Sequence, residues 1–173
     1  NAGPQDRMYD VLPLYHSARR AAGPLVQEGS PIRVSVAGVP EEIRLLRHRD
    51  ELPGTKIFFI EHDRYFDRDR LYGDAAGDYP DNHLRYALFT LAALEALPAL
   101  VQGPVLLHVH DWHAALALVY LRTRYAGIPR YDSIRSVLSV HNAGYQGHYP
   151  PSVMPELGLP WDLFNFRQLE WYG

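Results

Sequence analysis

Two segments of the sequence carry polar and ring-bearing side chains directly after short apolar runs. The first is His108-Val-His-Asp-Trp-His-Ala-Ala115, and the second is Leu138-Ser-Val-His-Asn-Ala-Gly-Tyr-Gln-Gly-His-Tyr149. Each apolar run is too short for anything but a buried strand. Open α/β sheets bind their ligands at the carboxyl ends of the strands. We therefore expect the two segments to contribute to one site.

The residue types of the first segment are compatible with three kinds of site. Side chains alternate along a strand, so His108 and His110 share one face, and Asp111 and His113 follow where the next helix begins. Two histidines at this spacing, with an aspartate and a third histidine nearby, could bind zinc. Alternatively, Asp111 caps the helix, one histidine belongs to the core and Trp112 packs against it. In the third interpretation the same side chains contact a polar ligand directly, and the spacing alone does not decide.

The second segment favours a carbohydrate ligand. His141 and Asn142 end a strand, and the glycines that follow allow tight turns or close approach to a ligand while displaying Tyr145 and Gln146. Sugar hydroxyls need paired donors and acceptors, and the C–H faces of a pyranose stack on aromatic rings. A sugar pocket therefore fits these residues better than a metal site. The alternative is a tight turn in which the glycines and the tyrosine are purely structural.

Strands and helices alternate in the order that a parallel sheet requires. Apolar and β-branched runs predict three strands, at 56–61, 105–110 and 136–141. Alternating residues at 32–36 and 43–47 predict a β-hairpin. The fold class is therefore α/β, with a parallel sheet, right-handed crossovers, flanking helices and a β-hairpin.

Helices and one long loop connect these strands. Asp81 is predicted to cap a helix that Pro98 ends, and apolar spacing predicts a second helix at 112–125. The stretch 62–80 is too polar for a core and too aromatic for a plain linker, which is typical of a functional loop.

The composition excludes several classes of function. With 173 residues, 47% of them hydrophobic, the chain is long enough for a single α/β domain. A net charge of -3 without a basic cluster argues against nucleic-acid binding. No apolar run approaches the ~20 residues of a membrane span, and no secretory signal opens the chain. The chain has no cysteine, which excludes disulfides and favours a reducing, cytoplasmic compartment.

The sequence resembles the N-terminal half of bacterial glycogen synthases and plant starch synthases. Six segments match that family in order and cover most of the chain from about Asp10 to Gly173. Besides the two segments above, they are Leu12-Pro-Leu-Tyr15, Leu71-Tyr-Gly-Asp74, Asp78-Tyr-Pro-Asp-Asn82 followed by Arg85-Tyr-Ala-Leu-Phe89, and Leu159-Pro-Trp161 with Phe164-Asn165.

The resemblance implies a retaining glucosyltransferase that needs no metal or other cofactor. Such enzymes have a two-domain GT-B fold whose Rossmann-like halves face each other across a cleft. They transfer glucose from ADP-glucose or UDP-glucose to the non-reducing end of an α-1,4-glucan. The first half holds mainly the acceptor and the second half mainly the nucleotide.

The resemblance also assigns roles to individual residues. His141 would position the transferred sugar, and Asp111 would either offset developing positive charge or hold a sugar hydroxyl. These two are the expected catalytic residues. The resemblance also implies substrate binding by Asn142, Tyr79, Trp112 and His113. Tyr145 and Gln146, which the glycines of the second segment display, complete the expected substrate-binding residues.

The chain departs from the family pattern at its start and lacks the family's second half. The family opens with a strand and a Lys-x-Gly-Gly-Leu loop that touches the donor phosphate, and the only lysine here, Lys56, lies in a predicted strand. Residues 1–173 are therefore expected to form the N-terminal domain, incomplete at its start, without the C-terminal nucleotide-binding domain. Alone they are expected to transfer no glucose. The alternatives are a noncatalytic glucan-binding module and a metal-dependent hydrolase that uses His108, His110, Asp111 and His113.

Overall fold

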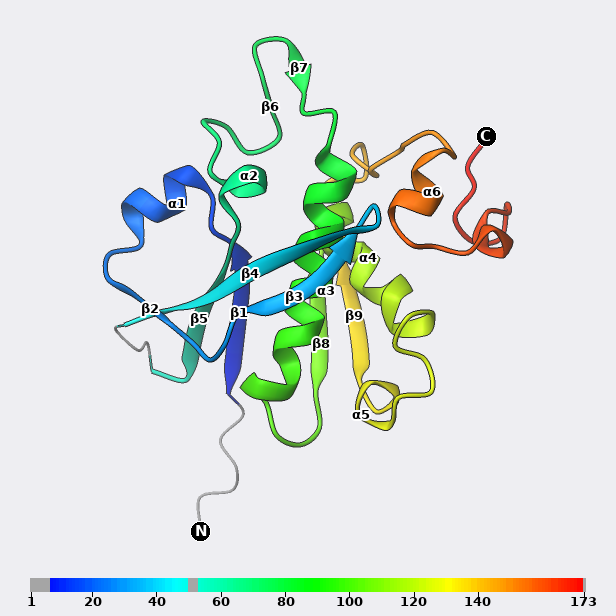
Figure 1. Ribbon diagram of the computed structural model, residues 1–173. Helices are drawn as coiled ribbons and strands as arrows, with labels where there is room; N and C mark the ends of the chain where they lie inside the picture. Colours follow the sequence, from blue (N-terminus) through cyan, green and yellow to red (C-terminus); the bar gives the residue numbers. More distant parts are fainter. Residues whose placement is uncertain (1–6, 50–52, 173) are drawn as a thin grey trace. The chain divides into compact units, whose positions relative to one another are not determined.

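The computed structural model describes residues 7–49 and 53–172, and they form two compact units (Figure 1). The first unit comprises the described residues of Asn1–Val34 and Glu42–Tyr79. The second comprises those of Ser35–Glu41 and Pro80–Gly173.

The first unit is built on a mixed sheet. Its strands run in the order β1 (Met8–Pro13), β5 (Thr55–Glu61), β4 (Val39–His48) and β2 (Leu25–Gln27), with β3 (Ile32–Val36) paired to β4 as the predicted hairpin. β1 is parallel to β5, whereas β4 is antiparallel to both β5 and β2. The predicted strand at 56–61 is thus confirmed as β5, which is rich in aromatic and β-branched residues and is buried from Phe58 to Glu61.

Short helices flank this sheet. A small core of Leu14, Leu46 and Phe59 packs against α1 (His16–Ala21) through Ala18. Glu61, which is only 5% exposed, accepts a hydrogen bond from Arg19 of α1 at 2.8 Å, so its buried charge is paired.

The stretch 62–80, predicted as a loop, contains regular structure. It begins with α2 (Asp63–Phe66), and the two-residue strands β6 (Gly73–Asp74) and β7 (Gly77–Asp78) pair to form a tight turn. A side chain at Gly73 would lie 2.2 Å from the carbonyl oxygen of Gly77, so the turn requires glycine there.

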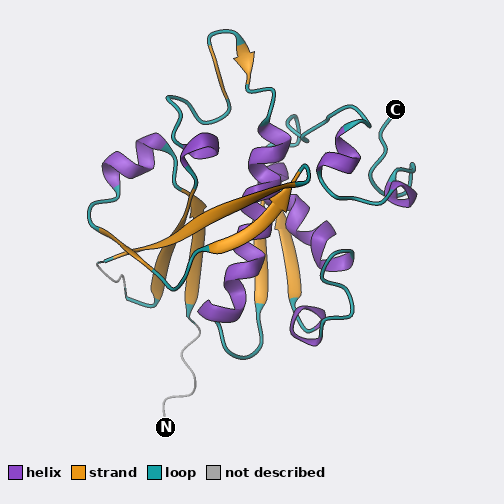
Figure 2. Ribbon diagram, in the orientation of Figure 1, coloured by secondary structure: helices purple, strands orange, loops and turns teal. Residues whose placement is uncertain are grey.

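The second unit contains the two strands that carry the motifs. β8 (Leu106–His110) and β9 (Arg135–Ser139) lie side by side and parallel (Figure 1), with His110 opposite Ser139. The crossover between them consists of α4 (Asp111–Arg122) and α5 (Pro129–Asp132), in purple in Figure 2. The long helix α3 (Asn82–Leu100) packs against α4. The chain continues into α6 (Val153–Glu156) and the 3-10 turn η1 (Trp161–Leu163).

The predicted parallel pairing of the runs 105–110 and 136–141 is confirmed by β8 and β9. One prediction about these strands needs correction. The run 136–141 was expected to be a buried strand, but β9 ends at Ser139 and exposes Val137 (45%) and Leu138 (43%). In the described part of the chain β9 has only β8 as a strand neighbour, so its side chains stay partly in contact with solvent.

The prediction that Pro98 ends the helix after Asp81 is also wrong. α3 continues to Leu100, with Pro98 inside it. Proline cannot donate to the carbonyl four residues earlier, which here belongs to Leu94. The hydroxyl of Tyr131 donates to that carbonyl instead, at 3.2 Å, so the helix loses a hydrogen bond without leaving a buried acceptor empty.

The other predicted helix differs only at its ends. α4 begins one residue before the predicted range 112–125 and ends at Arg122, where the Thr123 hydroxyl bonds the Val119 carbonyl and the backbone leaves helical geometry.

In the described part of the chain no helix is both long and apolar enough to span a membrane.

Candidate functional site

Asp111 lies where β8 passes directly into α4, and its backbone is strained. Its φ of 54° is in the left-handed region, which disfavours any residue with a Cβ atom. No side-chain hydrogen bond caps α4, so the structure does not support the alternative in which Asp111 caps the helix. Strain of this kind persists where the surrounding structure holds it in place, and it concentrates at functional sites.

The carboxylate of Asp111 reaches the second motif. Its Oδ1 accepts a hydrogen bond from the backbone N–H of His141 at 2.7 Å. This bond, with a smaller contribution from the backbone N–H of Asn142 and the nearby imidazoles, keeps the pKa of Asp111 below its ordinary value, although desolvation acts in the opposite direction. Asp111 therefore stays ionised near neutral pH and fastens the 141–142 turn to the start of α4.

A row of histidines lies beside this junction. His110 Nδ1 and His141 Nε2 are 2.9 Å apart, and the two rings stack at 5.2 Å between centroids. His108 Nε2 bonds the hydroxyl of Ser139 at 2.7 Å, and its ring lies 4.2 Å from that of His110. Three exposed imidazoles thus lie together, two on β8 and the third in the segment after β9.

The first turn of α4 packs its rings against α3. Trp112 and His113 both make edge-on contacts with Tyr86, at 4.9 and 4.7 Å between ring centroids. Burial lowers the pKa of His113, and the charge of Arg85 adds to this effect, while Asp111 opposes it. His113 is therefore neutral at pH 7. Arg85 is fully buried and donates to the side-chain oxygen of Asn82 at 2.6 Å.

The loop after His141 closes tightly over Trp112. Gly147 has a φ of 67°, and a Cβ atom there would lie 2.5 Å from Cε3 of Trp112. Tyr149 follows, with its ring 6.0 Å from that of Trp112 and 5.3 Å from that of His83. His83 in turn bonds Glu156 of α6 at 2.8 Å. The loop is thus held at both ends, by Asp111 and by the aromatic contacts.

The structure brings together most of the site residues expected from sequence. Asp111, His141 and Asn142 meet at the carboxyl ends of β8 and β9, as predicted, and Trp112 and His113 adjoin them. Tyr145 is 71% exposed, and the Gln146 side chain donates to the Ala143 carbonyl at 2.9 Å.

Tyr79 belongs to the first unit. There Arg68 lies 4.7 Å from its ring centroid, and the two residues line a hollow of about 550 Å³ with other polar residues of the 62–80 stretch. Its role as a sugar-binding residue stays a prediction.

Sequence reasoning missed several supporting residues. Tyr86 and Tyr149 contact the site from α3 and from the loop, the charge of Arg85 acts on His113, and Ser139 supports the histidine row. The signal that could have found Arg85 is its place as a charged residue inside an otherwise apolar helical run.

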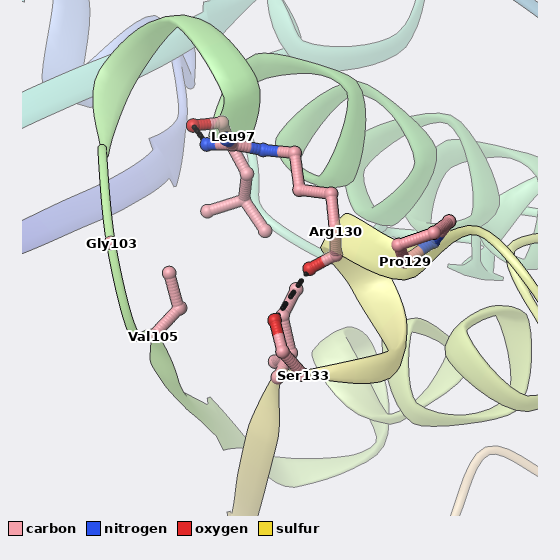
Figure 3. Close-up of a pocket in the computed structure, with 7 residues that line it drawn as sticks. Leu97, Gly103, Val105, Pro129, Arg130 and Ser133 are labelled. Atoms are coloured by element: carbon pink, nitrogen blue, oxygen red, sulfur yellow. Dashed lines mark hydrogen bonds between the residues drawn. The ribbon is translucent and has the colours of Figure 1, made fainter.

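A separate cavity of about 400 Å³ lies at the amino ends of β8 and β9, away from this site (Figure 3). Arg130 extends along it and donates to the backbone carbonyls of Leu97, at 3.1 Å, and Val101. Arg130 therefore closes the C-terminal end of α3. None of the predicted site residues lines this cavity.

In the described part of the chain, no three histidine, aspartate or glutamate side chains converge as a metal site. We predict that His108, His110 and His113 bind no zinc or other transition metal. A stoichiometric metal found by elemental analysis, with nitrogen ligands at about 2.0–2.1 Å, would contradict this prediction.

Comparison with known proteins identifies the family. The model of the starch synthase catalytic domain matches residues 6–173. The chain belongs to that family. A protein named glycogen synthase from Koribacter versatilis is 45% identical over 122 residues, which are 70% of this chain and 25% of that protein. Glycogen synthase from Syntrophotalea carbinolica is 36% identical over 162 residues, or 94% of this chain and 33% of that protein.

A solved structure of the starch synthase family has the same fold. The catalytic domain of starch synthase IV from Arabidopsis thaliana, bound to ADP and acarbose, superposes with a TM-score of 0.71 at 21% identity, over 94% of this chain and 39% of that one. This likeness confirms the predicted α/β fold of a GT-B glycosyltransferase. The chain spans between a quarter and a third of the length of the curated relatives it matches.

Proposed function

We propose that this chain is the N-terminal part of a retaining glucosyltransferase of the glycogen and starch synthase type. The parent enzyme transfers glucose from ADP-glucose or UDP-glucose to the non-reducing end of an α-1,4-glucan. The observation that carries the proposal is the bond from Asp111 to the 141–142 turn, which gathers a carboxylate, an imidazole and an amide at one sheet edge. The family match and the ADP and acarbose bound to the Arabidopsis domain support this donor and acceptor.

In this proposal the nucleotide and its phosphates bind to a further domain of the same enzyme. The chain covers only 25% to 33% of the glycogen synthases described above, which leaves room for such a domain. Residues 1–173 would then contribute mainly the acceptor side of a cleft. The bacterial origin of those relatives and the lack of cysteine support a cytoplasmic location in a bacterium.

Asp111 and His141 would act together during transfer. Retention with loss of a nucleoside diphosphate requires stabilisation of an oxocarbenium-like centre, and preorganised charges stabilise such a centre best. Asp111 is ionised and fixed by the His141 N–H, so it supplies a preorganised negative charge beside the turn. The 141–142 turn presents the side chains of His141 and Asn142 to the sugar.

The surrounding rings have different proposed tasks. Trp112 is covered by Gly147 and packs on Tyr86, so it mainly anchors the loop beside the sugar. His113 is neutral and can donate one hydrogen bond to a sugar hydroxyl or accept one from it. Tyr145, which is largely exposed, offers a ring on which a further glucose unit can stack. Tyr79 and Gln146 complete the proposed substrate-binding set.

Titration of the 173-residue chain with maltoheptaose tests the acceptor part of the proposal. We expect weak binding, with a Kd on the order of 1 mM, because the site is open to water. The backbone amide signals of His141, Asn142 and Tyr145 should shift, and Asn142→Ala should weaken the affinity. Cellohexaose, whose glucose units carry β-1,4 linkages, is the matched control and should bind more weakly. Equal binding of both sugars, or no shift at these amides, would contradict acceptor binding here.

A further inference from the structure

The histidine row on β8 and β9 is built by strand register. β8 and β9 are parallel, with His108 opposite Val137 and His110 opposite Ser139. Alternate residues of a strand share a face, so His108 and His110 lie on one face of β8. Both reach residues of the neighbouring chain segment, Ser139 and His141, by hydrogen bonds of 2.7 and 2.9 Å. The row therefore depends on this one pairing.

The bond between His110 and His141 constrains both rings. A hydrogen bond between two imidazole nitrogens needs a proton on one nitrogen and a lone pair on the other. The tautomer of His110 thus determines the tautomer of His141, and the near-parallel stacking of the rings, at 17° between planes, fixes their orientation. Because Nε2 of His141 faces His110, Nδ1 is the ring nitrogen that remains for a ligand.

Two separate contacts tie His141 to β8 and α4. Asp111 holds its backbone N–H, and His110 holds its ring. His108 limits the freedom of His110, because its own ring is fixed by Ser139 and lies 4.2 Å away. An exposed imidazole without such contacts would sample several rotamers, and ordering it during the reaction would cost entropy.

We propose that His110 is a positioning residue for His141, with His108 and Ser139 holding His110 in place. His110 keeps the His141 ring in one tautomer and one orientation, with Nδ1 directed to the sugar. The proposal rests on the proposed function, in which His141 contacts the transferred glucose. His110 itself touches neither donor nor acceptor and acts only through His141.

The test uses the full-length enzyme that contains this chain and compares two variants of His110. His110→Phe keeps a ring for stacking but removes the hydrogen bond, whereas His110→Asn retains a short polar group near the position of Nδ1. We expect His110→Phe to lower kcat by about 10- to 100-fold while the KM for glucan changes little, as for other groups that orient a catalytic residue. His110→Asn should recover part of the loss.

His16→Phe is the matched control. It removes an imidazole hydrogen bond of similar length, 2.8 Å to Asp67, from a partly exposed histidine of the first unit. It should leave kcat unchanged. All variants should unfold within a few degrees of the unmodified enzyme, because the His110 ring is exposed.

The ¹⁵N resonances of the His141 ring provide a readout that a purely structural role would not move. We expect His110→Phe to shift Nε2 of His141, and we expect no shift in His16→Phe. A kcat for His110→Phe within about twofold of the unmodified enzyme, or an asparagine variant no more active than the phenylalanine variant, overturns the proposal. If the unmodified enzyme transfers no glucose, the proposed function fails, and the ring resonances alone decide whether His110 sets the state of His141.

Discussion

At the scale of single residues, Asp111 connects the two motifs by one charged side chain. Its carboxylate accepts a hydrogen bond from the backbone N–H of His141, which lies in the segment after β9. The backbone of Asp111 itself adopts a φ of 54°. A hydrogen bond to an ionised acceptor is stronger than one between neutral groups, which explains why aspartate suits this position. The same charge is available beside the proposed sugar site.

Replacing Asp111 by Asn should separate charge from geometry. The amide oxygen of Asn can still accept the His141 N–H, but the negative charge is lost. We expect kcat of the full-length enzyme to fall by about 10²- to 10³-fold, as for the loss of one preorganised electrostatic contact, with little change in the KM for glucan. Initial rates at saturating donor measure this. Unchanged kcat would leave Asp111 with a purely structural role.

His113 should make folding stability depend on pH. Its folded-state pKa is below the ordinary value of 6.5, chiefly because the ring is buried, so the unfolded chain binds the proton more readily. The contribution of His113 to the free energy of unfolding is therefore complete above pH 6.5 and is lost as the pH falls from 6.5 towards the folded-state pKa. His113→Gln should decrease this loss. Urea unfolding of both proteins at pH 7.5 and pH 5.5 gives the comparison, and equal pH dependence in the two proteins would contradict it.

At the scale of elements, local sequence patterns predicted the strands and helices better than their ends. The runs that became β5 and β8 and the hairpin of β3 and β4 were recognisable because β-branched and alternating residues specify them locally. The end of α3 was not recognisable. Pro98 is tolerated inside the helix because the Tyr131 hydroxyl donates to the Leu94 carbonyl, and Tyr131 lies more than thirty residues further along the chain. The left-handed backbone of Asp111 likewise depends on a partner, His141, from another segment.

Tyr131 and Pro98 should therefore show energetic coupling. Tyr131→Phe leaves the Leu94 carbonyl without its hydroxyl donor, and we expect a loss of about 1–2 kcal/mol in the free energy of unfolding. In a Pro98→Ala background the backbone N–H of residue 98 can donate to the Leu94 carbonyl instead. Tyr131→Phe should then lower the free energy of unfolding by less. Urea denaturation of the two single variants and the double variant measures the coupling. Strict additivity would contradict the proposed compensation.

The loop over Trp112 can be tested by comparing two glycines. Gly147 and Gly158 have nearly the same φ, 67° and 66°, but only Gly147 lies against another side chain. Gly158→Ala should cost about 1 kcal/mol through backbone strain alone. Gly147→Ala should cost about 1–3 kcal/mol more because its Cβ would collide with the Trp112 ring. It should also weaken maltoheptaose binding. Similar denaturation midpoints for the two variants would mean that the loop moves aside freely.

At the scale of the whole molecule, family membership and fold class were predictable from the sequence, but the complete site was not. Six ordered segments were enough to indicate the family, and the matching family model covers residues 6–173. The meeting of Asp111, His141 and Asn142 was also predictable, because parallel strands end at the same sheet edge. The buried Arg85 and the contact of Gly147 with Trp112 depend on packing between segments that the sequence places far apart.

The most direct test of the account is glucose transfer by two polypeptides measured in parallel. The full-length enzyme and the 173-residue chain are incubated with glycogen and radiolabelled ADP-glucose or UDP-glucose, and the label in glycogen is counted. We predict incorporation by the full-length enzyme with at least one donor. We predict none above the blank with the chain alone. In the proposed function the groups that bind the leaving diphosphate belong to a further domain, and without them the departing negative charge is not stabilised. Clear incorporation by the chain alone, or none by the full-length enzyme with either donor, would contradict the account.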